Sequence, residues 1–219
     1  MATGASIPAH SRTATTRVVY VVAGQGRFFG RDSARAVPIE PGQALYIAAG
    51  VPYGIAQRGP APLELVGFET PDQGRAQPGD LVSSGALGAL PGADAMPALR
   101  PMPDIYSLGP PGAAGQPAPS RVAIYFDAEV TGEPHAYLGV LTAAPGMNIP
   151  LHSHAQETEI GFVLSGSAVM TVAGDEYPVG LGTGFQIPPT LKHSATVTGD
   201  QPLRMLQLYT PSGPEQRFK

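Results

Sequence analysis

Three histidines and one glutamate in the second half of the chain have the residue types and the spacing of a metal site. His152 and His154 are two residues apart, and residues i and i+2 of an extended strand project from the same face. Glu159 follows five residues later, and His193 lies further along the chain. Three neutral imidazoles and one carboxylate suit one divalent transition metal ion, such as Fe, Mn, Ni, Cu or Zn. Such a set also leaves room for water or substrate around the ion.

The residues around this set predict the strands that position it. Glu159 opens an apolar run that continues to Leu164, and residues 155–158 predict a turn that returns the carboxylate to the two histidines. A second apolar segment, residues 187–193, ends at His193. Short apolar runs bounded by turn residues predict a series of strands in this part of the chain: residues 121–126, 137–144, 147–154, 159–165, 167–173, 176–179, 184–188, 192–198 and 203–209.

These residues resemble the two sequence motifs of the cupin superfamily. The first motif is present without a spacing error at Gly146, His152, His154, Glu159 and Gly166. The second is matched at Gly182, Pro188 and His193, whereas Thr190 and Val197 stand where the family has glycine and asparagine. Two motifs in the right order are far more specific than one short motif. The resemblance implies that the metal ligands are His152, His154, Glu159 and His193.

The composition favours an all-β chain of short strands. The 219 residues include 28 glycines and 25 prolines, nearly a quarter of the chain, which is about twice ordinary usage. Tight turns between short strands account for this composition better than long helices do. The resemblance to cupins implies the fold class more closely: a double-stranded β-helix barrel, which is jelly-roll-like.

Charge and cysteine content exclude several classes of function. A net charge of -4 and a pI of about 5.7 provide no basic face for nucleic acid or an anionic membrane. The chain has no cysteine, which excludes disulfides, thiolate ligands and a cysteine nucleophile. Residues 1–20 lack the apolar core of a signal peptide, and no apolar run approaches membrane-spanning length. We therefore expect a cytoplasmic protein that acts on a small-molecule substrate and binds neither nucleic acid nor membrane.

The first third of the chain repeats the pattern of the second half, with a difference of two residues in one hairpin. The matched pairs keep apolar and turn positions: residues 7–12 with 149–154, 17–24 with 159–166, 37–42 with 177–182, and 62–71 with 202–211. Such self-similarity indicates one supersecondary unit that is used twice. We therefore predict a bicupin, with two barrels in one chain.

The repeat divides the chain into three parts. We predict a degenerate cupin domain at residues 1–71, a linker rich in Pro, Gly and Ala at residues 72–119, and a metal-binding cupin domain at residues 120–219. Residues 80–87 of the linker also predict a short capped helix. Only nine residues precede His10, so we expect the first copy to lack opening strands. Its sheet would then have an exposed edge that another segment must cover. The linker, the first strand of the second copy or a neighbouring subunit are the candidates, and we expect a homodimer.

The first copy has lost the metal ligands. At the four metal positions it carries His10, Arg12, Arg17 and Tyr53. Two guanidiniums stay charged at ordinary pH and repel a divalent cation, so we expect no metal there. Two interpretations stay open. Either this copy is a degenerate barrel that is kept for packing and dimer contacts, or the four residues form an anion site in which the paired arginines bind a carboxylate or phosphate.

A few other polar residues are candidates for the downstream site. Glu157 has the same strand parity as Glu159, so both carboxylates are candidate catalytic groups, although an isolated Glu157 also fits a solvated turn. Gln156 and Gln186 are candidate hydrogen-bond donors to ligands or substrate. Gln207 and Tyr209 lie on the last predicted strand without a definite place in the site.

The expected chemistry follows from a metal ion inside a barrel. Such an ion polarises a carbonyl or carboxylate, activates water, or binds dioxygen beside a chelated substrate. We expect a metal-dependent bicupin enzyme that acts on a small organic acid, ketone or phenol, and the resemblance suggests a dioxygenase-type oxidoreductase. One alternative is a redox-neutral isomerase, lyase, decarboxylase or cyclase. Another is a cupin without catalysis that binds a small ligand.

Overall fold

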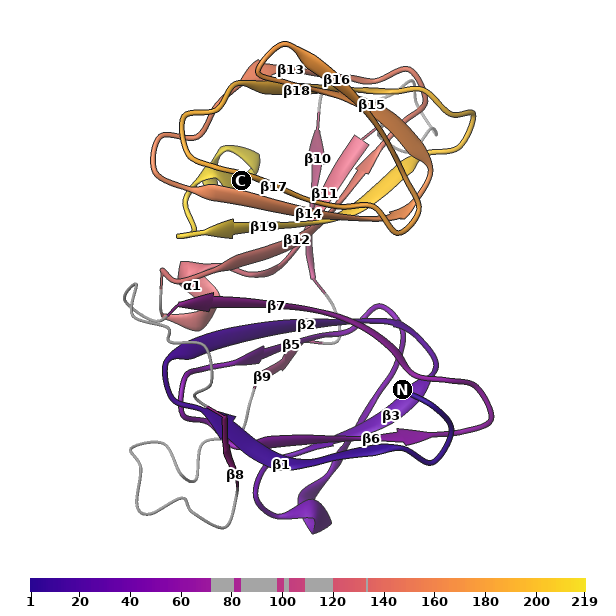
Figure 1. Ribbon diagram of the computed structural model, residues 1–219, viewed down its shortest axis with the longest axis vertical. Helices are drawn as coiled ribbons and strands as arrows, with labels where there is room; N and C mark the ends of the chain where they lie inside the picture. Colours follow the sequence, from indigo (N-terminus) through magenta and orange to yellow (C-terminus); the bar gives the residue numbers. More distant parts are fainter. Residues whose placement is uncertain (72–80, 84–97, 101–102, 109–119, 133) are drawn as a thin grey trace. The chain divides into compact units, whose positions relative to one another are not determined.

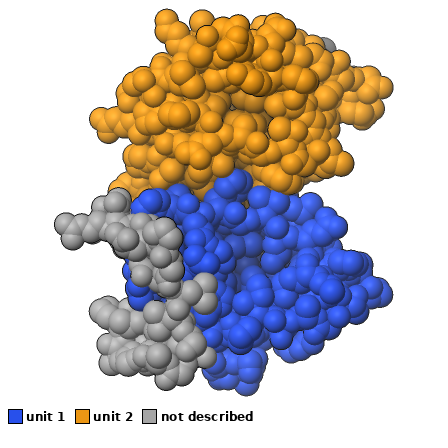
Figure 2. Space-filling model, in the orientation of Figure 1, with its two compact units in different colours: residues 1–102 blue, residues 103–219 orange. Residues whose placement is uncertain are grey.

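A computed structural model describes residues 1–71, 81–83, 98–100, 103–108, 120–132 and 134–219 of the chain (Figure 1). The chain divides into two compact units, Met1–Met102 and Pro103–Lys219. Figure 2 shows them in separate colours, blue for the first unit and orange for the second.

The first unit contains two antiparallel sheets that face each other (Figure 1). One sheet has the strand order β4-β3-β6-β1-β8 and the other has the order β7-β2-β5-β9. The strands are β1 (Ser6–Arg12), β2 (Thr15–Ala23), β3 (Gln25–Phe29), β4 (Val37–Ile39), β5 (Ala44–Ile47), β6 (Tyr53–Arg58), β7 (Glu64–Pro71), β8 (Leu81–Ser83) and β9 (Ala98–Arg100), with a short 3-10 helix η1 (Ser33–Arg35).

The second unit repeats this architecture with a larger sheet. The two sheets have the orders β10-β11-β12-β19-β14-β17 and β13-β18-β15-β16. The strands are β10 (Asp104–Leu108), β11 (Ser120–Phe126), β12 (Tyr137–Ala143), β13 (Asn148–His152), β14 (Thr158–Ser165), β15 (Ser167–Val172), β16 (Asp175–Gly180), β17 (Gly184–Ile187), β18 (His193–Val197) and β19 (Leu203–Thr210). The described residues of this unit also form two short helices, α1 (Ala128–Thr131) and η3 (Pro214–Phe218).

Each unit encloses its own hydrophobic core between its two sheets. Along β14 the side chains alternate between buried and partly exposed, so that Glu159, Gly161 and Val163 face inward. The core of the second unit contains Val163 and Met205, and the core of the first contains Phe28 and Leu45. This period-two burial confirms the predicted all-β class with two barrels.

The strand registers confirm the internal repeat. His10 pairs with Tyr53 across β1 and β6, and His152 pairs with His193 across β13 and β18. The same holds one sheet away, where Arg17 pairs with Ile47 and Glu159 pairs with Ile187. The positions that were matched in sequence therefore occupy the same places in both barrels.

At two matched turn positions, the backbone conformation is the same in both copies. Gly24 and Gly166 share a φ of 77°, and a Cβ at either would overlap the carbonyl of the proline in the facing turn. Gly50 has a φ of 79°, and Thr190, its match in the second copy, has a φ of 68°. Thr190 thus keeps the left-handed backbone of the glycine that the second motif lacks, which is rare for a β-branched residue.

The predicted linker contributes strands to both units. β8 pairs with β1 and β9 pairs with β5. The segment between the copies therefore adds one strand to each sheet of the first unit. β10 pairs with β11 in the second unit. Residues 81–83 form β8 and not the helix expected at residues 80–87, whose other residues lie outside the described ranges. In the part of the chain that the structure describes, no helix is long and apolar enough to cross a bilayer.

Candidate metal centre

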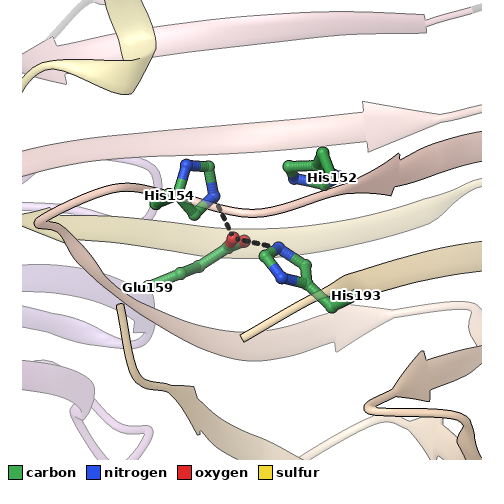
Figure 3. A group of neighbouring side chains, drawn as sticks. All are labelled: His152, His154, Glu159 and His193. Atoms are coloured by element: carbon green, nitrogen blue, oxygen red, sulfur yellow. Dashed lines mark hydrogen bonds and ion pairs between the residues drawn. The ribbon is translucent and has the colours of Figure 1, made fainter. Parts of the chain in front are cut away.

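The structure brings His152, His154, Glu159 and His193 together, as their spacing predicts (Figure 3). The ligand atoms of the four side chains lie within 4.8 Å of one another. His152 ends β13, Glu159 lies near the start of β14, and His193 begins β18. Three of the four residues are buried, and His152 is half-buried. Within the described ranges, this is the only group of three or more histidine or acidic side chains arranged to hold a metal ion.

Backbone carbonyls fix the tautomers of two of the histidines. The Nδ1 atom of His152 lies 2.7 Å from the Pro150 carbonyl oxygen, and that of His193 lies 2.9 Å from the Leu191 carbonyl oxygen. Because a carbonyl only accepts, each Nδ1 carries a proton and donates it. The Nε2 lone pairs are then directed at the centre of the cluster, which is the arrangement of metal-ligating histidines.

Glu159 lies at the middle of the cluster. Its Oε2 atom is 3.0 Å from the Nε2 of His154 and 3.1 Å from the Nε2 of His193, as the dashed lines in Figure 3 show. Its Oε1 atom accepts a hydrogen bond of 2.9 Å from the Gln207 amide. Burial alone raises the pKa of Glu159, but hydrogen bonds from His154, His193 and Gln207 outweigh burial and hold this pKa far below its usual range.

The donor set fits a divalent cation. With Nδ1–H of His193 committed to a carbonyl, its Nε2 and the Glu159 oxygen are both acceptors unless a proton or a metal ion lies between them. Burial lowers the pKa of His193, but the hydrogen bonds to Glu159 and to the Leu191 carbonyl, with the negative charge of Glu159, together outweigh burial and raise this pKa above its usual value. A bound metal ion would compete with a proton at this place, and these four side chains are the group that could hold it.

A cavity of about 390 Å³ opens beside the cluster. His152, Glu159 and His193 form part of its wall, and Gln207 lies next to them. Most of the remaining wall is apolar and includes Leu108, Leu141, Met147, Ile149, Met170 and Met205. A volume of this size suits a small organic ligand rather than water alone.

Of the other predicted residues, Tyr209 lies beside the cluster, whereas Glu157, Gln156 and Gln186 do not line the cavity. Glu157 is absent from the wall of the cavity, and its carboxylate accepts a hydrogen bond of 3.2 Å from the backbone N–H of Gln156. Gln156 and Gln186 are exposed. Tyr209 is fully buried, and its ring centroid lies 4.9 Å from that of His154.

Cavity-wall residues outside the predicted strands were missed from sequence. Leu108 belongs to β10, within the predicted linker, and Arg217 belongs to η3, after the last strand. Neither lies in a segment with strand periodicity that points to the site. Only Gly213-Pro214, which favours a turn and a new helical start, indicated that the chain folds back after β19.

The four matched residues of the first unit also lie together, and Glu69 joins them. The Nη1 atom of Arg12 is 2.8 Å from Oε2 of Glu69, and Arg17 contacts both Glu69 and the Tyr53 hydroxyl. The rings of His10 and Tyr53 have centroids 4.4 Å apart. Glu69 was missed from sequence, although the repeat matches it with Tyr209. One carboxylate therefore accepts from both guanidiniums at the place that the metal cluster has in the second unit.

Comparison with known families identifies the class of protein. The Cupin domain family matches residues 1–68 and 139–209, which together are more than half of the chain. The chain therefore belongs to the cupin family, and the two matched regions fall in the two barrels. It is a bicupin whose second barrel holds a cluster able to bind a divalent metal ion.

Two curated proteins are similar to parts of this chain. Polyketide synthase CurC of Streptomyces cyaneus is 26% identical over 84 residues, which cover 38% of this chain and 54% of that protein. The uncharacterized protein MJ1618 of Methanocaldococcus jannaschii is 30% identical over 79 residues, which cover 33% of this chain and 63% of that protein. The chain thus spans about half to two thirds of the length of these relatives.

Solved structures with the same fold include oxalate decarboxylase of Bacillus subtilis. One mutant of that enzyme has a TM-score of 0.66 at 18% identity over 97% of this chain and 67% of that chain. The enzyme at pH 4.6 has a TM-score of 0.64 at 19% identity over 96% of this chain and 66% of that chain. Another of these structures concerns the Mn(II) centres of that enzyme. At identities this low, the structural likeness shows a shared fold and no more.

Proposed function

We propose that the second barrel is a metal-dependent enzyme site that oxidises a small, largely apolar organic molecule, with His152, His154, Glu159 and His193 as the metal ligands. The observation that carries this proposal is the buried ligand set at the wall of an apolar cavity. When bound, a redox-active ion such as Fe would mediate electron transfer from a neighbouring substrate to dioxygen, so that the substrate is oxidised and both oxygen atoms enter the product. The reaction class is then that of a dioxygenase.

The chemistry of the cavity wall supports oxidation. Apart from the ligands, its polar side chains are Ser194, Gln207 and Arg217, and none of these is a usual general base near neutral pH. Gln207 is committed to Glu159. Apolar walls exclude water from a reactive intermediate, which favours chemistry with dioxygen over hydrolysis.

Each protein residue has a defined part in this proposal. His152 and His193 keep their Nδ1 protons on backbone carbonyls and present Nε2 to the ion. Gln207 orients the Glu159 carboxylate, and the ring of Tyr209 lies against His154 and limits its rotation. The apolar wall holds the body of the substrate and keeps water out.

A second candidate is a redox-neutral reaction, such as the closure of a ring or the loss of a carboxyl group. The similarity to a protein named as a polyketide synthase supports this candidate, because polyketides contain carbonyl groups that a Lewis acid polarises. Here the metal need not change its oxidation state, and Zn would serve as well as Fe.

Oxygen uptake distinguishes the two candidates. Purified protein is stripped of metal, reloaded with ferrous iron or with Zn, and supplied with phenols, diketones and aromatic acids in an oxygen electrode. The proposal requires consumption of oxygen that depends on both ferrous iron and an added organic compound. Turnover without oxygen in the Zn-loaded protein would instead support the redox-neutral reaction. Metal binding without turnover of any compound would contradict both candidates.

A further inference from the structure

The short helix η3 places Arg217 and Phe218 in the wall of the metal cavity. Arg217 is exposed, so its guanidinium lies at the rim of the cavity where solvent enters. Phe218 is half-buried and packs against the cluster of Tyr137, Tyr209 and their neighbours. The chain after β19 therefore closes one side of the cavity that the barrel strands leave open.

Polar contacts at both ends hold η3 in this position, and those of Glu215 are buried. Glu215 is fully buried, and its Oε2 atom accepts a hydrogen bond of 2.7 Å from the backbone N–H of Gly213. At the other end, the Lys219 ammonium lies 2.7 Å from Oδ2 of Asp127 and 2.6 Å from Oε2 of Glu129. Contacts on both sides of Arg217 fix its backbone. Its side chain is therefore held in the wall of the cavity.

Arg217 differs from the other basic groups near the two sites. Arg12 and Arg17 share the carboxylate of Glu69. The guanidinium of Arg217 lies over the Phe218 ring, 4.9 Å from its centroid, and its Nη2 atom is 3.5 Å from the Tyr209 hydroxyl. Among the residues that the structure describes, no carboxylate forms an ion pair with it. A cavity-lining cation without an acidic partner is available for an anion from solution.

The charge of the whole site also favours an anion. A divalent ion on the cluster would outweigh the single negative charge of Glu159, and Arg217 adds a further positive charge in the cavity wall. A site of one sign with apolar walls attracts ligands of the opposite sign.

We propose that the substrate of this site is an apolar organic acid whose carboxylate binds Arg217 while its apolar body fills the cavity. This inference rests on the proposed function, because it names the substrate class of the same cavity. A guanidinium binds a carboxylate through two parallel N–H bonds, which fixes the direction of the substrate as well as its charge. A substrate as small and polar as oxalate would leave the apolar wall of a cavity of about 390 Å³ unfilled.

The test compares carboxylates with their neutral amides. Benzoate, 3-phenylpropionate and octanoate, each paired with its primary amide, are titrated into Zn-loaded protein and followed by calorimetry. We expect at least one carboxylate to bind about tenfold more tightly than its amide, a difference of about 1.4 kcal/mol. In Arg217→Gln this preference should disappear while the affinity for the amide is kept, and Arg217→Lys should keep part of the preference.

Matched controls separate this inference from the proposed function. Arg204→Gln removes an exposed charge from β19 outside the cavity wall and should leave the preference unchanged. Bound Zn is measured in every variant, since Arg217→Gln should retain it. A preference that survives Arg217→Gln overturns the inference even if metal and turnover are present, and so does the lack of preference for every carboxylate. A preference that requires Arg217 but no metal supports the inference while the proposed function fails.

Discussion

Arg17 and Glu69 lie opposite each other on β2 and β7 and form an ion pair. The second unit has Glu159 opposite Tyr209 at the same register, on β14 and β19. The carboxylate proposed as a metal ligand in one barrel thus has a basic residue at its place in the other, and the residue across from it is acidic there. An ion pair connects the strands of the first barrel at the place where a metal ion is proposed to connect those of the second.

Removal of Glu69 should destabilise the first unit. The side chains of Arg12, Arg17 and Glu69 are only 25–30% exposed, so Glu69→Gln leaves two guanidiniums close together without a counter-charge. We expect the free energy of unfolding to fall by roughly 2 kcal/mol, measured by urea denaturation. Glu64→Gln, at an exposed position on the same strand, is the matched control and should have little effect. Equal stability of the Glu69 variant would show that the ion pair makes no net contribution.

Loss of one proposed ligand should abolish the stabilisation by metal. His152→Ala removes a half-buried side chain at the cavity wall, so the apoprotein should change little. A ligand at about a thousand times its Kd stabilises the folded state by about 4 kcal/mol, and we expect this increment to disappear in thermal melts with added Zn. His135→Ala, in a turn outside the cluster, should retain it. Unchanged metal content in His152→Ala would refute the ligand assignment.

The Gln207 amide should contribute to metal affinity without binding the ion. Its hydrogen bond to Oε1 of Glu159 orients the carboxylate, and the loss of such partners usually weakens metal binding by about 10- to 100-fold. We expect Gln207→Leu to show a loss in this range by competition with a chelating indicator, while one ion per chain still binds. Gln201→Leu, in the exposed turn before β19, should not change the affinity. An unaltered Kd in Gln207→Leu would mean that Glu159 is oriented by the metal itself.

Sequence could predict the cluster but not everything around it. The spacing of His152 and His154 predicts one shared face, and the structure brings both to the cluster although β13 ends at His152. The spacing to Glu159 leaves room for only one turn. The place of Gln207 depends on the pairing of β14 with β19, where Gly161 lies opposite it. A register between strands so far apart in sequence is set by packing of the whole barrel, and the local pattern does not contain it.

The strands β8 and β9, which the sequence did not predict, have a similar explanation. β8 and β9 have three residues each, too few for a period of two to stand out in a segment rich in Pro, Gly and Ala. Their pairing is decided by the free edges of β1 and β5.

Arg217 lies after the last strand, and its approach to the cavity follows from the burial of Glu215 and the contacts of Lys219, which are tertiary effects.

Metal binding should strengthen as the pH rises. Burial lowers the pKa of His193, but its hydrogen bonds to Glu159 and the Leu191 carbonyl and the charge of Glu159 together raise this pKa above its usual value. In the apoprotein this pairing stabilises the fold below the unfolded-state pKa of about 6.5, and the contribution is lost as the pH rises through the raised folded-state pKa. Metal needs the neutral ring, so protons compete with it. Melts of apoprotein and Zn-loaded protein between about pH 5.5 and 8 should therefore show a growing metal increment, and a constant increment would contradict a role for His193.

A metal site should be recoverable in the first barrel. His10 already lies at the position of His152, and the pairing of β1 with β6 has the register of β13 with β18. The proposed variant restores the remaining matched residues: Arg12→His, Arg17→Glu, Tyr53→His and Glu69→Tyr. These changes remove the ion pair and supply three imidazoles and one carboxylate, so we expect two bound metal ions per chain by elemental analysis.

The affinity of this second site should be lower than that of the first. Gly67 takes the place of Gln207 in the repeat, so no amide orients the new carboxylate, and a weakening of about 10- to 100-fold is expected. The same variant with His10→Ala added is the control, since it lacks one ligand and should bind a single ion. If the four-residue variant folds, as judged by its circular dichroism, yet binds only one ion per chain, the equivalence of the two sites in space would not extend to their chemistry.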